Sequence, residues 1–498
     1  WRLAAALAAP ALCAAPLALL PGACVDSLFQ HLALPDLFLL VHRFPDEGMG
    51  IEAHLQVMTE MLNVFSVMLD HDGLAAVVAA VPFLAGLVMA SAWIRQLAGP
   101  AAAALGTGLA LTLTWTVWTF LGGKNDPAAA GIILAAVICL ERGAHRPAAL
   151  CWGVACAVKY NGFFLAVPAT LWHEASRLRR RGRAWRPDPA WLGLLLLPLL
   201  PWMTENWLFR ADPLWPNPFW PFDGYLDGRA SREGLRLLMG PRPPAGRLLD
   251  GVARAWREAQ PALLFALVPA VWFGRRLPPA WKRAVWRTAA ALAFLALGVR
   301  FEAERLSLPC LLLLALLAGA PLGAALGGAS RGVRALLLAL LAALAWLQVA
   351  HGVAGAGIDP PEAARVLLGA ETPAAYRARR LTTYAEAGAA LDRLPGVRSV
   401  LLCGDNRRYR LHGRVRVDEA YGRSAAWALA RDSADPARIA IRLRQRNVTH
   451  VVENFVTEEF PHPESAPFAW EAPQLRTWAA FVGRHLRPAA LPVHVDHP

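Results

Sequence analysis

Long apolar runs alternate with short polar breaks along the chain as far as residue 352. A helix needs about 20 mainly apolar residues to cross a bilayer, so each run predicts a membrane span. Nine single spans are expected at 3–21, 74–94, 101–121, 127–141, 190–209, 260–274, 284–299, 306–324 and 333–352.

The run at 147–172 does not fit one straight helix, because "VKYNGF" (Val158 to Phe163) places Lys, Asn and Gly at its midpoint. We expect two short helices that form a hairpin entering and leaving on one side. Irregular backbone at membrane depth is tolerated only where protein or a watery cavity surrounds it. With the hairpin, about ten or eleven membrane helices are expected.

Charge along the chain predicts which loops face the cytoplasm. The Arg-rich segments 177–186, 273–287 and 329–334 all fall on one side of the predicted topology, as the positive-inside rule requires. Polar residues in the opposite loops then gather on the outer face at the ends of several helices. Convergence of this kind is how a membrane protein builds a site. These outer residues are Asp26, Lys124, Lys159, Asn206 and Arg305.

Two outer loops, at 22–73 and 210–259, are long enough to carry structure. In the first, apolar residues from Ile51 to Leu69 recur at helical spacing and predict an amphipathic helix. Such a helix suits the membrane interface, and binding of a partner protein is the alternative. The second opens with "PLWPNPFWPFDGY", whose prolines and aromatic rings are typical of a membrane surface.

The pattern changes after residue 352. Strand-like "VRSVLLC" and "VTHVVEN" alternate with helix-like "YAEAGAALDRL" in an Arg-rich region. The predicted fold class is therefore a membrane all-α bundle at 1–352, followed by a small α/β domain outside the membrane at 353–498. "CGDNRRY" follows the first strand but has a single Gly, so it is interpreted as a loop and not as a nucleotide site.

Composition supports an integral membrane protein. The 498 residues are 56% hydrophobic and 17% charged, with a mean hydropathy of +0.36, too apolar for a soluble protein of this length. The net charge of +13 raises nucleic acid as a partner. The basic residues are scattered or lie between apolar runs, so we expect no nucleic-acid binding. The seven cysteines include no C-x-x-C pair, and the six in or beside apolar runs are interpreted as small hydrophobic residues.

Lysine is rare in this chain. Of 50 Lys and Arg residues only Lys124, Lys159 and Lys282 are lysine. A compact ammonium suits a single phosphate or carboxylate partner, whereas Arg is a broad planar fork. Lys282 lies in an ordinary basic loop, but the other two stand at breaks between apolar runs. In "GGKNDP" we expect Asp126 to cap a helix with Pro127 at its first position, which leaves Lys124 to contact a phosphate.

Several segments resemble motifs of bacterial GT-C glycosyltransferases, the broad group that includes glycosyltransferase family 39 and the lipopolysaccharide-core sugar transferases. The resemblance covers nearly the whole chain, in the order that the family has. The similar segments are "VDSLFQHLALPDLFL", "TEMLNVF", "GGKNDPAAAGIILA", "GVACAVKYNGFFLAVP", "ENWLFRADPLWPNPF", "ERLSLPCLLLLALLAG" and "RQRNVTHVVEN".

The resemblance implies a GT-C-like bundle that uses a sugar on a polyprenyl phosphate as donor and inverts the anomeric centre. Its acidic residue in the first outer loop is the catalytic base, which corresponds to Asp26. The acceptor would be a glycan, lipid or protein hydroxyl on the periplasmic face of a bacterial inner membrane. A divalent metal occurs in some relatives and stays open here. The expected substrate-binding residues are His31, Glu60, Lys124, Asp126, Lys159, Tyr160, Asn206 and Arg305.

The sequence departs from the family pattern at Gln30, Glu205, Asp212 and Leu306. A degenerate family member is therefore one alternative. A transporter or lipid-handling protein that uses the same polar cavity without catalysis is another.

Simpler explanations also stand for individual residues. Asp26 could lie in headgroup water, His31 could be an interfacial histidine, and Glu60 could be the solvated edge of its amphipathic helix. Tyr160 and Asn161 could simply satisfy the hairpin turn.

Overall fold

The computed structural model of the chain is mostly helical. It describes residues 2–22, 27–42, 58–159, 162–163, 165–166, 170, 189–210, 212–213, 260–298, 307–403, 408–409, 411, 414–416, 429–430, 433–453 and 472–488.

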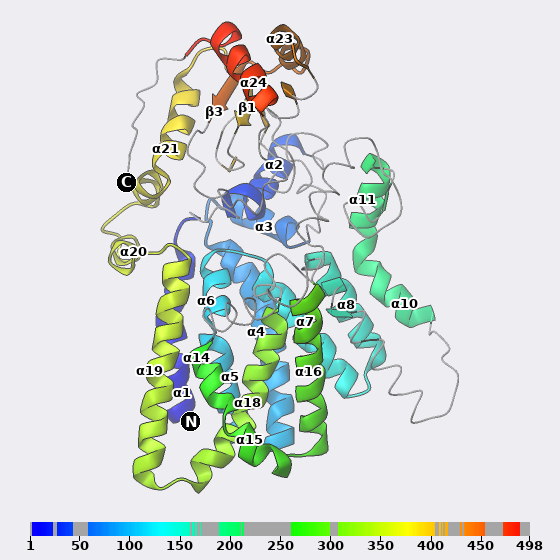
Figure 1. Ribbon diagram of the computed structural model, residues 1–498, viewed down its shortest axis with the longest axis vertical. Helices are drawn as coiled ribbons and strands as arrows, with labels where there is room; N and C mark the ends of the chain where they lie inside the picture. The colour runs from blue at the N-terminus through cyan, green and yellow to red at the C-terminus, as the bar shows by residue number, and fades with distance from the viewer. Residues whose placement is uncertain are drawn as a thin grey trace. The chain divides into compact units, whose positions relative to one another are not determined.

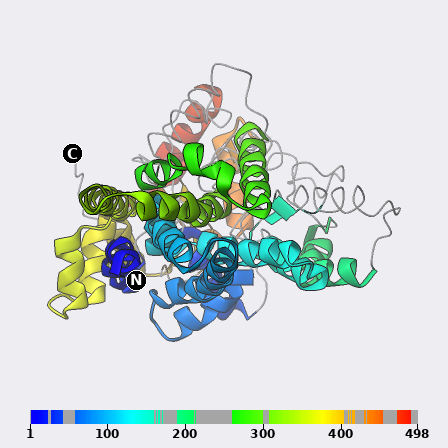
Figure 2. The same cartoon turned by 90° about the horizontal axis from the view of Figure 1, so that it is seen from below.

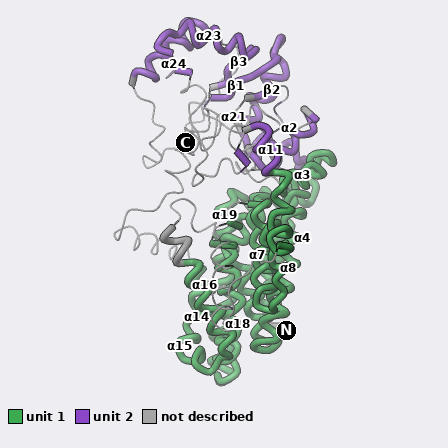
Figure 3. The backbone as a smooth tube through the Cα atoms, turned by 90° about the vertical axis from the view of Figure 1, so that its right-hand side faces the viewer, with its two compact units in different colours: residues 1–24, 56–202, 239–370 green, residues 25–55, 203–238, 371–498 purple. Residues whose placement is uncertain are grey.

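The chain divides into two compact units, each assembled from separate stretches of sequence (Figure 3). Unit 1 contains Trp1–Cys24, Gln56–Trp202 and Met239–Ala370, and unit 2 contains Val25–Leu55, Met203–Leu238 and Glu371–Pro498. The first outer loop therefore contributes to both units. A periplasmic domain that begins at residue 353 stays a prediction.

Helices of unit 1 run alongside one another in Figure 1, and Figure 2 shows several of them end-on. The main helices are α1 (Arg2–Ala14), α3 (Met58–Met68), α4 (Leu74–Ala98), α5 (Pro100–Thr112), α6 (Thr114–Leu121), α7 (Asp126–Glu141), α8 (His145–Val158), α10 (Pro189–Leu196), α14 (Pro261–Leu267), α15 (Ala270–Phe273), α16 (Pro279–Gly298), α18 (Leu308–Gly328), α19 (Arg331–Gly355) and α20 (Pro360–Leu367). Short 3-10 turns lie at Ala15–Leu19, Leu197–Leu199 and Gly274–Arg276.

Each single span expected from hydropathy coincides with helix in the described residues. Among the described residues, four helices are long and apolar enough to cross a membrane, namely α4, α18, α19 and the continuous Pro189–Phe209. The pair α5 and α6 makes a fifth if it counts as one span bent by 52°. The expected total of ten or eleven membrane helices stays a prediction. Of the expected hairpin, the first half is α8, and most of the second half lies outside the described residues.

Glycines allow the central helices to approach one another closely. A Cβ added at Gly131 on α7 would lie 2.3 Å from the carbonyl oxygen of Pro82 on α4, and one at Gly86 would lie 1.9 Å from the Gly131 oxygen. On α18, a Cβ at Gly319 would lie 2.1 Å from the Ala102 oxygen on α5. Small residues at helix contacts are typical of membrane bundles. The position of α7, whose first turn carries Asp126, depends on this contact.

Gly131→Ala is expected to destabilise the protein by about 1–3 kcal/mol, because the backbone of α4 must move to admit the methyl group. Thermal unfolding of the detergent-solubilised protein measures the effect. Gly327→Ala on α18 is the matched control, since nothing lies within 4 Å of its added Cβ. Equal unfolding temperatures for the two variants would show that α4 and α7 are not in backbone contact.

Buried amides stabilise the break between α5 and α6. Leu113 is extended at the break (ψ 131°), so the amide of Thr114 cannot bond to a carbonyl in the preceding turn. It donates instead to Oε1 of Gln260 at 2.7 Å, and Nε2 of Gln348 donates to the same oxygen at 2.7 Å. Gln348 Oε1 in turn accepts from the amide of Ala262 at 2.7 Å. Side-chain partners of this kind let a broken helix persist in an apolar bundle.

Unit 2 contains a three-stranded parallel sheet in the order β2-β1-β3. The strands are β1 (Ser399–Cys403), β2 (Arg414–Arg416) and β3 (His450–Glu453), and the described helices with them are α21 (Pro373–Arg393), α23 (Pro436–Gln445) and α24 (Ala472–His485). The strands expected in "VRSVLLC" and "VTHVVEN" are confirmed. Every residue of the central strand β1 is buried, as parallel sheets require.

Unit 2 also contains residues from the first outer loop, as the π-helical turn η2 (Ser27–His31) and α2 (Ala33–Val41). Most of α11 (Leu200–Arg210) belongs to this unit as well.

Candidate functional site

Helix α3 turns its polar face inward. Thr59, Glu60, Asn63 and Ser66 are buried at helical spacing, while the apolar side chains on the other face are exposed, Phe65 by 62%. The amphipathic helix expected here is thus confirmed over 58–68, and its exposed apolar face suits a membrane interface. Glu60 has no exposed surface, so the interpretation of it as a solvated edge is wrong.

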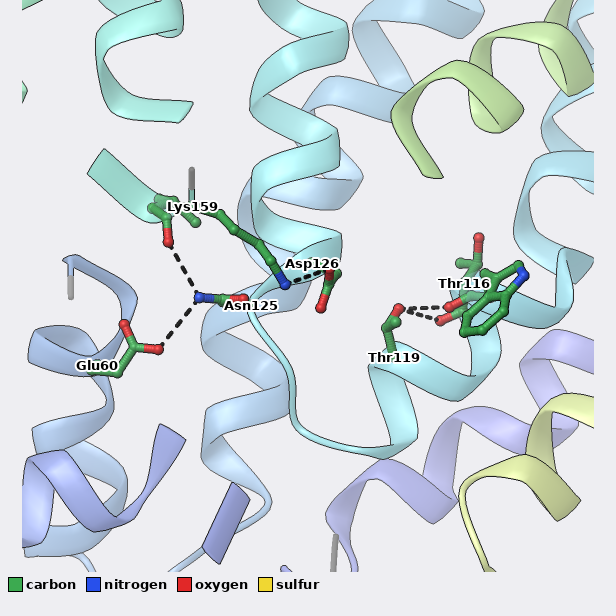
Figure 4. Close-up of polar contacts among 8 residues, drawn as sticks. Glu60, Thr116, Thr119, Asn125, Asp126 and Lys159 are labelled. Carbon is green, nitrogen blue, oxygen red and sulfur yellow. Dashed lines mark hydrogen bonds and ion pairs between the residues drawn. The ribbon is translucent and has the colours of Figure 1, made fainter. Parts of the chain in front are cut away.

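The end of α8 and the start of α7 meet in a buried ion pair (Figure 4). Nζ of Lys159 lies 2.6 Å from Oδ1 of Asp126, and both side chains are buried. Lys159 is extended at the end of α8, where its backbone leaves the helix. The pair joins residues 33 positions apart, so helix packing brings them together.

The expected capping role of Asp126 is wrong. Asn125 occupies the N-cap position of α7 and makes no side-chain capping bond, and Asp126 is already the first helical residue. Its carboxylate instead forms an ion pair with the Lys159 ammonium. Pro127 does lie in the first turn, as predicted.

Asn125 connects α3, α7 and α8 (Figure 4). Its Nδ2 donates to Oε1 of Glu60 at 3.4 Å and to the backbone oxygen of Val158 at 3.2 Å. Both partners are acceptors, which fixes the orientation of the amide. Its Oδ1 is buried and has no hydrogen-bond partner in the described part of the chain, so it can accept a bond from a ligand hydroxyl. This role of Asn125 was not predicted from the sequence. The one sequence signal that could have suggested it is the position of Asn125 between Lys124 and Asp126.

Lys124 is buried beside the same helix start. Its ammonium lies 3.8 Å from the centroid of the Trp118 ring, a cation–π contact that orients the charge. The turn that carries it is held by the Lys124 amide, which donates to the Thr119 oxygen at 3.0 Å. Of the two lysines singled out by their rarity, Lys159 therefore pairs with Asp126 through helix packing, and Lys124 precedes Asp126 by two residues in the chain.

The remaining predicted residues do not belong to this cluster as described. His31 and Asn206 are buried in unit 2, as are the departures Glu205 and Asp212. Asp26, Tyr160 and Arg305 lie outside the described residues. Their roles stay predictions.

The described residues offer no metal-binding cluster. No three His, Cys, Asp or Glu side chains in this part of the chain lie close enough together to hold a metal ion. The donors of the cluster around Asp126 are two carboxylates, amides and ammonium groups, a set that suits polar hydroxyls and anions better than a cation.

No protein-family model and no curated protein matches the sequence. Solved structures do match. The chain is similar to ArnT from Cupriavidus metallidurans bound to undecaprenyl phosphate, with a TM-score of 0.52, 15% identity and coverage of 89% of this chain and 88% of that one. The apo state of the same protein gives a TM-score of 0.51, 15% identity and coverage of 82% and 84%. The GT-C fold expected from the sequence is thus confirmed.

Proposed function

We propose that this GT-C-fold protein is an integral membrane glycosyltransferase. It transfers a sugar from a polyprenyl-phosphate donor to an acceptor hydroxyl on the periplasmic face, with inversion at the anomeric carbon. The observation that carries the proposal is the buried ion pair of Lys159 and Asp126 where α8 ends and α7 begins, with buried Lys124 two residues before Asp126. Buried charges are costly in a membrane bundle and mark functional sites there. The ligand of the similar ArnT structure, undecaprenyl phosphate, fits such a cationic site.

The proposed reaction is a single displacement. The carboxylate of Asp26 takes the proton of the acceptor hydroxyl, whose oxygen attacks the anomeric carbon of the donor sugar. The bond between that carbon and the phosphate oxygen breaks, and polyprenyl phosphate leaves with its electron pair. No step is assigned to a metal ion.

The cations act on the leaving group. Negative charge grows on the phosphate as the bond breaks, and preorganised cations lower the barrier most where charge develops. Asp126 keeps Lys159 in place, and the Trp118 ring does so for Lys124. Glu60 and Asn125 present a carboxylate and an amide oxygen, groups that can accept bonds from sugar hydroxyls.

Mass analysis of membrane lipids tests the function. Removal of the protein is expected to cause accumulation of one polyprenyl-phosphate-linked sugar, which the purified protein then consumes with release of polyprenyl phosphate. Lipid profiles that are identical with and without the protein would overturn the proposal.

Lys124→Gln is expected to raise KM for the lipid-linked sugar by about ten- to a hundredfold, since a charge-assisted bond is worth about 1.5–3 kcal/mol. Titration with undecaprenyl phosphate should show the same loss of affinity. Lys282→Gln is the control, because that lysine lies in the first turn of α16, and not in the loop expected from the sequence, and donates in an exposed position to the backbone oxygen of Arg275. A loss of equal size in both variants would show a general charge effect and remove Lys124 from the site.

A transporter or lipid-handling protein is the second candidate, and the bent pair α5 and α6 favours it. Broken helices around polar groups are common in transporters. The same lipid experiment separates the two functions. A transporter moves the lipid-linked sugar across a vesicle membrane and leaves its amount unchanged, whereas the transferase consumes it.

A further inference from the structure

Arg408 is a buried charge that the proposed reaction does not use. It lies in the "CGDNRRY" segment after β1, and only 1% of it is exposed. Arginine stays protonated at any physiological pH, so its burial needs compensation by nearby groups.

The backbone around Arg408 bonds to the first outer loop within unit 2. The amides of Arg408 and Tyr409 both donate to the Leu28 oxygen in η2, at 3.2 and 3.0 Å. The hydroxyl of Tyr384 on α21 donates to the Tyr409 oxygen at 2.7 Å. Residues 408 and 409 thus join η2 to the helix that precedes the sheet.

The side chain makes two further links. Its Nη1 donates to the Val415 oxygen of β2 at 3.2 Å. Burial lowers the pKa of the guanidinium, whereas the carboxylate of Asp36 on α2 raises it by favouring the charged form. The backbone bonds to Leu28 and the side-chain bond to Val415 therefore connect two parts of unit 2, namely the 27–41 segment and the strands.

We infer that Arg408 is a positioning residue that fixes the segment following Asp26 onto the α/β part of unit 2. The inference rests on the proposed role of Asp26. Leu28 comes two residues after Asp26, and two residues of chain span at most about 7 Å. A carbonyl held at Leu28 therefore limits where the base can lie. The α/β part of unit 2 then contributes to catalysis indirectly, through the segment that follows Asp26.

Hydrogen exchange of the full-length protein in nanodiscs tests the link. In Arg408→Met, amide exchange in 27–31 and at 408–409 is expected to be about tenfold faster than in the wild type, because a buried charge-assisted bond is lost. Arg408→Lys keeps the charge and should show a smaller change. Arg393→Met on α21 is the control, since that exposed side chain bonds within its own helix, to the Ala389 oxygen. Unchanged exchange in Arg408→Met would overturn the link.

Measurements of kcat and KM test whether Arg408 is a positioning residue. The donor in this assay is the lipid-linked sugar that accumulates when the protein is removed. Arg408→Met is expected to lower kcat by about 10- to 100-fold with little change in KM, as misplacement of a catalytic group does. Asp36→Asn should act in the same direction but less strongly, because the Arg408 side chain keeps its bond to the Val415 oxygen. A wild-type kcat alongside faster exchange would overturn the positioning role.

Asp26→Asn is measured in parallel to separate the two proposals. If that variant is fully active, the proposed function of Asp26 fails, and the inference about Arg408 fails with it. If it is inactive while Arg408→Met has a wild-type kcat, only the inference about Arg408 is wrong.

Discussion

Asp126→Asn is expected to destabilise the protein by about 3–5 kcal/mol, because it leaves the buried ammonium of Lys159 without its counter-ion. Lys159→Met should cost a similar amount by removing the cation that pairs with the buried Asp126 carboxylate. The double variant Asp126→Asn with Lys159→Met replaces both charges and should regain most of the lost stability. Thermal unfolding in detergent measures all three, and the difference from additivity is the coupling energy of the pair.

Activity should not follow stability in this series. If Lys159 stabilises the leaving phosphate, the stable double variant still transfers sugar about 10²- to 10³-fold more slowly than the wild type. Glu371→Gln is the control, since its partner Arg379 is exposed by 36% and pairs of that kind contribute about 0–1 kcal/mol. Wild-type stability of Asp126→Asn would show that the pair is not buried. Wild-type transfer by the double variant would remove Lys159 from the reaction.

Asp26→Asn is expected to lower the transfer rate by about 10²- to 10⁴-fold, the usual effect of removing a general base. The amide cannot take the acceptor proton, but it leaves the phosphate site unaltered, so affinity for undecaprenyl phosphate should stay at the wild-type value. Asp26→Glu keeps a carboxylate and should retain part of the activity.

Asp435→Asn is the matched control for this substitution. Asp435 caps α23 by accepting from the Ala437 amide at 3.0 Å, and Asn caps a helix equally well. It should therefore transfer sugar at the wild-type rate. Full activity of Asp26→Asn would show that another group is the base, and loss of undecaprenyl phosphate binding would show that Asp26 acts on the donor.

Much of the helical part was predictable because hydrophobic runs are local signals. The run at 74–94 became α4 and the run at 333–352 became α19, each with a few more residues. The break at 101–121 was not predictable, because Leu113 looks like any other apolar residue. It is the amides of Gln260 and Gln348, far away in sequence, that let the helix bend there.

For the candidate site, the rarity of lysine pointed to Lys124 and Lys159, and both are buried in the cluster. The division of roles inside "GGKNDP" was partly wrong. Helix capping is the usual expectation for an Asp before a Pro. In the structure, the Asp126 carboxylate instead forms an ion pair with the buried Lys159 ammonium at the end of α8.

The sequence by itself determined the apolar character of the chain, the places of its helices and the gathering of polar residues at helix ends, because these depend on composition and local periodicity. The tertiary structure alone decided that Lys159 pairs with Asp126, that Asn125 joins three helices and that the polar face of α3 points inward. These contacts join residues tens of positions apart. They depend on which helices pack against one another, as α7 does on α4 at Gly131, and no local pattern records which helices those are.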